Sequence, residues 1–333
     1  MAKEQTPKMN KYTVKKYDQN DYKLWNDFIV QAKNATFLFH RDFMEYHQDR
    51  FEDFSLLIFE EEKLKAILPA NKKENSIYSH QGLTYGGLVY KEETKQTSII
   101  EIFQELLSFL NKNSFEKIYL KTIPSIYHLK PAEEILYALF LAEAKLIRRD
   151  SLSVIDLLQE KSISTIRKRG VKKALLNKII IKEETNFELF WNEILVPNLE
   201  KRHNAKPVHS IEEMNYLKSL FPQNIRQFNV YFEDEIIAGT TIFETESVVH
   251  CQYISKNPNK ETLGGLDFLF HFLIHERYTD KSYFDFGISN ENKGKNLNKG
   301  LTYWKESFGA STIIHDFYEI ETSNYTKLNG IFV

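Results

Sequence analysis

Hydrophobic and polar residues alternate along the chain in stretches that predict helices and strands in turn. In the first half, Leu24, Trp25, Phe28 and Ile29 recur at helical spacing and predict a helix over Asp21–Lys33, capped by Asp21. The other first-half elements are a hairpin of Ser55–Phe59 and Lys65–Ala70 around the turn Glu60–Lys63, a helix over Ser98–Asn111, a strand over Lys117–Lys121, a helix opened by Pro131, and strands around Lys145–Leu157.

The second half repeats this order after Lys161. It begins with a basic helix over Ile163–Leu176, a strand over Ile179–Lys182, and helices over Phe187–Lys201 and Ile211–Leu220. A meander of Arg226–Phe232, Ile236–Glu244 and Val248–Ser255 precedes a helix over Gly264–Tyr278, a strand over Tyr283–Gly287, a helix over Lys299–Phe308 and a strand over Thr312–Tyr318. A meander followed by alternating helices and strands predicts a mixed, mostly antiparallel sheet flanked by helices.

The repeated order predicts an α/β (α+β) protein of two domains, residues 11–160 and 161–333, after a disordered lead-in of residues 1–10. A length of 333 residues agrees with two domains of roughly 150 residues each.

Charge and cysteine content narrow the function classes. Lys and Arg number 44 against 46 Asp and Glu, so the overall balance gives no electrostatic reason to bind DNA or an anionic membrane. The single Cys251 excludes an intramolecular disulfide and fits a reducing compartment. The longest apolar run, Ile135–Ala142, is far shorter than the ~20 residues of a membrane span, and the charged N-terminus is unlike a secretory signal. We therefore expect a cytoplasmic protein without a transmembrane segment.

Two short motifs lack residues that their chemistry requires. The stretch Gly287–Glu291 ends on Glu where a nucleophile elbow needs a second Gly. His271 and His275 share a helix face, but Phe272 stands where a zinc-protease motif needs Glu. Neither a catalytic serine nor a metal site is predicted.

Two features suit phosphate groups. Gly264 and Gly265 precede a helix, so they either bring backbone N–H groups to a pyrophosphate or form a simple turn. The stretch Arg167–Lys173 holds five cations in seven residues. These cations either neutralise the phosphates of a nucleotide, a lipid carrier or tRNA, or form a solvated helix face.

The segment that follows the strand Tyr283–Gly287 is the most distinctive in the chain. A polar loop rich in Asn and Lys leads into an amphipathic helix in which Lys305 follows Trp304. Loops held by rigid elements commonly carry functional sites. Lys305 either stabilises a developing oxyanion or is a surface lysine whose stem covers apolar neighbours.

At this segment the chain resembles the FemAB family and its relatives, the CelD/BioF-like acetyltransferases, which consist of two GNAT-like domains in tandem. The resemblance rests on Phe284, Asp285 and Gly287 followed by Trp304-Lys305-Glu306-Ser307-Phe308-Gly309. Further matches are Tyr85-Gly86-Gly87-Leu88, the basic helix around Arg167–Lys173, Leu199-Glu200-Lys201-Arg202-His203 and the hairpin Val230–Phe243. In this order they cover about residues 12–320.

The resemblance implies two tandem GNAT-like domains and an N-acyltransferase that transfers an acyl or aminoacyl group to an amine, commonly on a peptidoglycan or other envelope precursor. It implies that Lys305 is catalytic and stabilises charge at the reacting carbonyl. It also implies substrate-binding roles for Tyr85, Gly86, Gly87, Arg202, Asn298 and Trp304, and phosphate-binding roles for Arg167, Arg169 and Lys172.

The donor and the acceptor stay open. The donor is acyl-CoA or aminoacyl-tRNA, with no tightly bound cofactor, and the acceptor is a small molecule or an envelope precursor. Glu261–Leu266, the segment most like the family's pyrophosphate loop, keeps the middle Gly but begins with an acid. His47 and Ile123 replace the family's phosphate-holding lysine and its acid before a proline, which argues against a nucleotide-linked muramyl-peptide acceptor. Those two differences also support another alternative, a catalytically inactive GNAT-like binding module.

Overall fold

The computed structural model describes residues 11–160 and 162–333, apart from the side chains of residues 202 and 203. The predicted lead-in of residues 1–10 lies outside this described part. The chain forms two compact units: the first extends to Arg148 and includes His315–Val333, and the second is Arg149–Ile314. The sequence-based boundary after residue 160 falls inside the second unit, and the hydrophobic pattern gives no sign that the last strand returns to the first.

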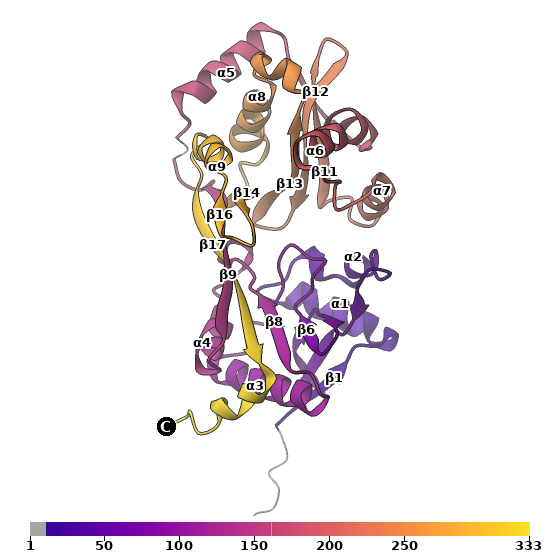
Figure 1. The fold of residues 1–333 in the computed structure, drawn as a ribbon, viewed down its shortest axis with the longest axis vertical. Helices are drawn as coiled ribbons and strands as arrows, with labels where there is room; N and C mark the ends of the chain where they lie inside the picture. The colour runs from indigo at the N-terminus through magenta and orange to yellow at the C-terminus, as the bar shows by residue number, and fades with distance from the viewer. Residues whose placement is uncertain (1–10, 161) are drawn as a thin grey trace, which may run out of the picture. The chain divides into compact units, whose positions relative to one another are not determined.

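In the first unit, helices pack on two groups of strands (Figure 1). The helices are α1 (Tyr22–Gln31), α2 (Arg41–Glu45), α3 (Gln96–Lys112) and α4 (Glu134–Leu141). The first group is a sheet of four strands in the order β1 (Tyr12–Lys16), β3 (Leu56–Glu60), β4 (Lys63–Leu68) and β7 (Val89–Tyr90). The second group has the order β17 (Ser311–Glu321), β8 (Lys117–Lys121), β6 (Ser76–Tyr78), β5 (Asn71–Lys73) and β2 (Glu52–Asp53). The core forms where Ile99, Phe103, Leu106 and Leu110, at helical spacing on α3, are buried against strand residues.

Two first-unit helix starts differ in part from the sequence pattern. The helix α1 begins directly after Asp21, as expected, but the side-chain cap comes from Asp18, in a capping box with Asp21 that starts a short turn just before α1. The helix expected at Pro131 begins at Glu134.

In the second unit, one twisted sheet carries the helices (Figure 1). Its strands follow one another as β10 (Ile180–Glu184), β11 (Ile225–Phe232), β12 (Glu235–Glu244), β13 (Val248–Lys256), β14 (Tyr283–Ile288) and β9 (Lys145–Asp156), with a small separate hairpin of β15 (Asn290–Glu291) and β16 (Asn296–Leu297). The helices are α5 (Thr165–Leu176), α6 (Val196–His203), α7 (Ile211–Leu220), α8 (Gly265–Phe272) and α9 (Lys299–Glu306), with π-helical turns at Phe190–Leu195 and Leu273–Arg277. All pairs in this strand order are antiparallel except β13 with β14.

Helices cover both faces of this second sheet. Val230 and Ala238, which are paired on β11 and β12, join the core that includes Leu269 and Phe270 of α8. Gly239 points to the opposite face, where an added Cβ would lie 2.6 Å from the Phe190 ring. The sheet is therefore a rigid layer between two sets of helices. None of the described helices combines the length and apolar character that a bilayer crossing requires.

Candidate functional site

Strands β13 and β14 run side by side for three residue pairs and then part. Their last pair is His250 with Asp285, although β13 continues to Lys256 and β14 to Ile288. Just beyond the parting point, a register shift on β13 leaves Gln252 outside the pairing with β12. Backbone groups of β13 beyond His250 thus lack the β14 partner that a regular sheet would give them.

A histidine–aspartate pair lies where the two strands part. His250 Nδ1 is 2.9 Å from Asp285 Oδ2, and Asp285 Oδ1 accepts a hydrogen bond of 2.7 Å from the Gly287 N–H. Asp285 is 1% exposed. A buried carboxylate on one ring nitrogen fixes the orientation of the imidazole, which leaves Nε2 available for proton transfer.

Lys305 is buried beside this pair and is not a surface lysine. It is 2% exposed, and its Nζ donates hydrogen bonds to the carbonyls of Gly287 at 2.9 Å and Ile288 at 2.6 Å. Burial lowers the pKa of Lys305 to about 8, while the negative charge of Asp285 acts in the opposite direction. Two of its three N–H donors have backbone partners among the described residues, so one remains for a reacting group.

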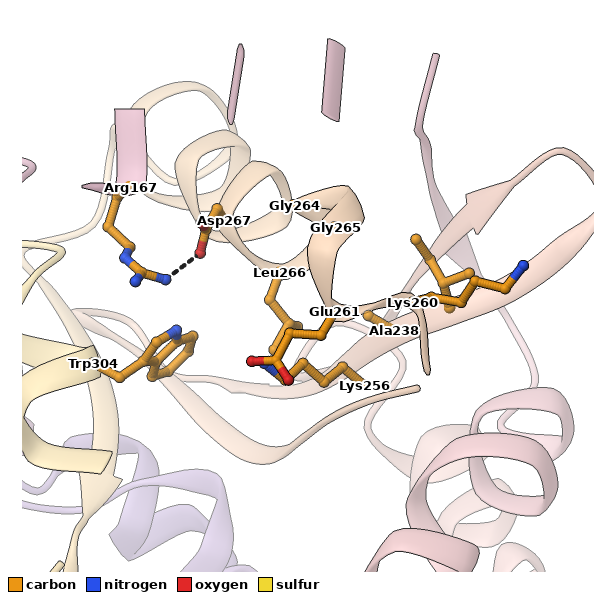
Figure 2. Close-up of a pocket in the computed structure, with 11 residues that line it drawn as sticks. Arg167, Ala238, Lys256, Lys260, Glu261, Gly264, Gly265, Leu266, Asp267 and Trp304 are labelled. Atoms are coloured by element: carbon orange, nitrogen blue, oxygen red, sulfur yellow. Dashed lines mark hydrogen bonds and ion pairs between the residues drawn. The ribbon is translucent and has the colours of Figure 1, made fainter. Parts of the chain in front are cut away.

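A polar cleft of about 180 Å³ opens at the start of α8 (Figure 2). Its lining includes three cations and two acids, together with Trp304 of α9 (Arg167, Lys256, Lys260, Glu261, Asp267). The first N–H groups of α8 also face this end, because a helix leaves them without intrahelical partners. Lys260 turns its ammonium away from the cleft toward Glu235, with Nζ 3.0 Å from Oε2. Each lining cation therefore has an acidic partner, and the first N–H groups of α8 are what make the cleft suit an anionic group.

Acidic neighbours hold the cations of the polar cleft in place. Arg167 Nη1 lies 2.6 Å from Asp267 Oδ1, and Lys256 Nζ lies 2.5 Å from Glu261 Oε1. Burial raises the pKa of Asp267, and the charge of Arg167 partly offsets this. The Nε of Arg167 is buried and has no hydrogen-bond partner among the described residues.

A second, more apolar groove of about 250 Å³ adjoins the polar cleft. Lys256, Leu266 and Trp304 line both. The groove is completed by Leu195, Asn198, Leu199, Ile254, Ser255 and Leu301. Phe270, Phe286 and Phe308 support the Trp304 ring with edge-on contacts, their centroids 5.1–5.6 Å away. A ligand with an anionic end and an extended, less polar arm fits the two together.

The glycines before α8 serve helix packing. Gly264 has φ +81°, and an added Cβ would lie 2.2 Å from the Gly170 carbonyl oxygen of α5. At Gly170 an added Cβ would lie 1.8 Å from Asp267 Oδ2. These glycines let α5 approach α8 closely enough for Arg167 to reach Asp267.

The structure brings only some of the sequence-predicted residues to the clefts. Arg167 and Trp304 line the polar cleft, and Lys305 follows Trp304 without lining either cavity. Arg169 and Lys172 are exposed on α5. Asn298 caps α9 by accepting the Leu301 N–H at 3.0 Å. The side chain of Arg202 is outside the described part of the structure.

The first-unit candidates have packing contacts. Tyr85 is buried, and its hydroxyl donates to Thr36 Oγ1 at 2.9 Å. An added Cβ at Gly86 would lie 1.6 Å from the Ser79 carbonyl oxygen, and Gly87 has φ +106°. His47 is buried and stacks on Tyr46 and His80. The substrate-binding role of Tyr85, Gly86 and Gly87 stays a prediction.

Sequence reasoning missed His250, Lys256 and Lys260. His250 and Asp285 are far apart in the sequence, and only the β13–β14 pairing brings them together. Lys256 and Lys260 flank the turn Asn257-Pro258-Asn259, where exposed cations are ordinary. The available signal for these two lysines is their position on either side of the turn, a few residues before Gly264.

Comparison with solved structures identifies the fold. No protein-family model matches the chain, and no curated protein matches its sequence. The crystal structure of FemX matches 95% of this chain and 99% of its own length, with a TM-score of 0.66 and 9% identity. A tandem GNAT protein from the clavulanic acid biosynthesis pathway matches 93% of this chain and 98% of its own, with a TM-score of 0.53 and 10% identity. The chain has a tandem GNAT-like fold.

A third structure with this fold is the C-terminal domain of a protein from Agrobacterium fabrum that is assigned as a lysylphosphatidylglycerol synthetase. It matches 93% of this chain and 95% of its own, with a TM-score of 0.59 and 11% identity. Identities this low establish the shared fold, so the predicted fold class is confirmed, and the chemistry must be argued from the site itself.

Proposed function

We propose that the protein is an N-acyltransferase whose second unit binds a carrier-linked acyl donor. The observation that carries this proposal is the parting of β13 from β14 beside a polar cleft that adjoins an apolar groove. The fold, which this chain has in common with a tandem GNAT protein and with FemX, supports acyl or aminoacyl transfer as the reaction class.

An acyl-CoA suits the two cavities as donor. Its phosphates would face Arg167 and the first N–H groups of α8, where the buried Arg167 Nε lacks a partner among the described residues. Its pantetheine arm would lie along the Trp304 groove, where amide groups can pair with the open edge of β13. Glu261, expected to repel phosphate, instead neutralises Lys256 at the rim.

The proposed reaction is direct attack by an acceptor amine on the thioester carbonyl. The amine nitrogen forms a bond to the carbonyl carbon and gives its proton to His250 Nε2, which Asp285 orients. The remaining N–H of the Lys305 ammonium stabilises the oxyanion. The carbon–sulfur bond then breaks, and the leaving thiolate takes the proton from His250, so the products are an amide and a free thiol.

The acceptor is an amine on a small molecule or an envelope precursor, and we place the reaction in the cytoplasm. No metal or tightly bound cofactor takes part in this scheme. Positioning of the amine next to the carbonyl provides most of the acceleration.

An aminoacyl-tRNA is the second candidate donor. The exposed Arg169 and Lys172 of α5 favour it, because such cations neutralise RNA phosphates. Binding of tRNA would then weaken steeply with salt and on neutralising Arg167–Lys173.

The test is a transfer assay in which purified protein, acetyl-CoA and a panel of amines are followed by release of free thiol. We expect amine-dependent release that Lys305→Ala reduces roughly a hundredfold, while the matched control Lys299→Ala, exposed on the same helix, keeps full activity. If no amine in the panel causes release of thiol and charged tRNA does act as donor, the function is aminoacyl transfer. Inactivity with both donors would support the binding-module alternative.

A further inference from the structure

The second unit carries a strongly cationic surface that the overall charge conceals. Eight of the 44 Lys and Arg residues lie between Glu160 and Glu183, a stretch with no Asp or Glu. On α5, only Arg167 points into the polar cleft, where Asp267 pairs with it. Lys168, Arg169, Lys172 and Lys173 are exposed, as is Lys178 just beyond the helix. None of these five has an ion-pair partner among the described residues.

Exposed apolar side chains stand among these cations. Leu175 and Leu176 are 58% and 75% exposed at the end of α5. Lys172 lies four residues before Leu176, so the two share a stripe of the helix. The buried side of α5 is the opposite one, where Gly170 and Ala174 pack against α8 and against Gly264 just before it. The exposed side has no partner within the described chain.

Charge complementarity selects the occupant of this surface. Cations with protruding leucines suit a surface that is anionic at its face and apolar just beneath, and an anionic phospholipid bilayer has this structure. RNA would engage the cations but would gain nothing from two exposed leucines, since bases stack on aromatic rings and guanidinium planes. A protein partner would need an acidic and apolar groove, and nothing on this chain indicates one.

We propose that the α5 surface (Lys168, Arg169, Lys172, Lys173, Leu175, Leu176 and Lys178) docks the protein onto anionic membranes. The cations hold the helix against the phospholipid headgroups, and Leu175 and Leu176 enter the boundary between headgroups and acyl chains. Docking is peripheral and reversible, and it goes beyond the proposed transferase activity, on which it does not depend.

Cosedimentation of the full chain with vesicles tests the docking surface. Vesicles of phosphatidylcholine alone are compared with vesicles that also contain phosphatidylglycerol, at low and high salt. We expect binding only to the vesicles that contain phosphatidylglycerol, and we expect salt to weaken it. Each of two double variants, Leu175→Ser with Leu176→Ser and Lys172→Glu with Lys173→Glu, should reduce this binding roughly tenfold. Matched controls on the first unit, Val30→Ser for the apolar change and Lys63→Glu with Lys112→Glu for the charge reversal, should bind as the unaltered protein does.

A probe at the helix end tests insertion directly. Cys251 is buried, so a polarity-sensitive dye couples to the new thiol of Leu176→Cys. Its emission should shift to the blue with anionic vesicles and stay unchanged with neutral ones. Equal binding by the serine variant, or no shift, would overturn the proposal. Salt-sensitive binding of tRNA without vesicle binding would overturn it too and assign the cations to RNA.

Discussion

The ammonium of Lys305 donates a hydrogen bond of 2.9 Å to the carbonyl of Gly287 and so joins α9 to the end of β14. A second bond to the Ile288 carbonyl fixes the same ammonium. Because Trp304 precedes Lys305 on α9, this tie also sets the position of the ring that lines both cavities. One lysine therefore shapes the proposed donor site and holds a positive charge beside it.

The burial of Lys305 predicts a pH-dependent stability. Its pKa falls from 10.5 in the unfolded chain to about 8 in the fold, so the unfolded state binds more protons between these values. The stability contributed by the neutral amine is present above 10.5 and is lost as the pH falls through about 8. Compared with Lys305→Met, the unaltered protein should gain stability as the pH rises across this interval, by on the order of 3 kcal/mol.

Urea unfolding of both proteins across that interval measures this difference. The control Lys299→Met changes an exposed position of the same helix. Its free energy of unfolding should depend on pH in the same way as that of the unaltered protein. Parallel profiles for the unaltered protein and Lys305→Met would show that the amine is not desolvated in the fold.

The His250–Asp285 pair predicts a role in proton transfer. His250→Gln should lower turnover roughly a hundredfold, the ordinary contribution of a positioned general base. The loss should fall on turnover and leave donor binding unchanged. His271→Gln, on α8 and away from both cavities, is the matched control. Full turnover in His250→Gln would remove His250 from the reaction.

The close approach of α5 to α8 predicts an unusual response to Gly→Ala. In a helix interior this change normally stabilises by about 1 kcal/mol. At Gly170 the new Cβ would displace the Asp267 carboxylate, and at Gly264 it would meet the Gly170 carbonyl at a positive φ. Both variants should lose about 1–3 kcal/mol of unfolding free energy. The control Gly300→Ala should not be destabilised, because the nearest atom to an added Cβ there is 3.8 Å away. Equal changes in the free energy of unfolding for all three variants, measured by chemical denaturation, would contradict the packing described.

The ion pair at the rim of the polar cleft predicts a gain of affinity. Glu261→Gln removes a negative charge and releases Lys256 for a phosphate. Calorimetric titration should show CoA binding several-fold more tightly than to the unaltered protein, and the gain should shrink with salt. Glu246→Gln, an exposed acid elsewhere on the second unit, should have no effect. Weaker CoA binding in Glu261→Gln would mean that the carboxylate itself contacts the donor.

The sequence predicted the meander of the second unit well because its strands are apolar runs bounded by polar turns. The meander of β11, β12 and β13 lies within a few residues of its expected positions. The expected helix over Phe187–Lys201 is continuous but widens into a π-helical turn before Pro197, whose nitrogen cannot donate a hydrogen bond.

The site was harder to predict than the elements, because it depends on strand pairing. Lys305 and Trp304 were recognisable beside a polar loop, and Arg167 lay in a visible cationic run. The His250–Asp285 contact and the parting of β13 from β14 arise only from long-range pairing. The sequence leaves the glycines before α8 as either a phosphate-binding helix start or a simple turn, whereas the carbonyl that requires Gly264 belongs to Gly170, on a different helix.

Tryptophan fluorescence tests the donor site most directly. Trp25 and Trp191 are buried, whereas Trp304 lines both cavities. Titration with a short acyl-CoA should change the fluorescence of the unaltered protein in a saturable way, with a dissociation constant below about 10 µM, or roughly −7 kcal/mol. Trp304→Phe should abolish the change while calorimetry still detects binding. A saturable change that persists in Trp304→Phe, or no binding heat at any temperature, would contradict the account of this site.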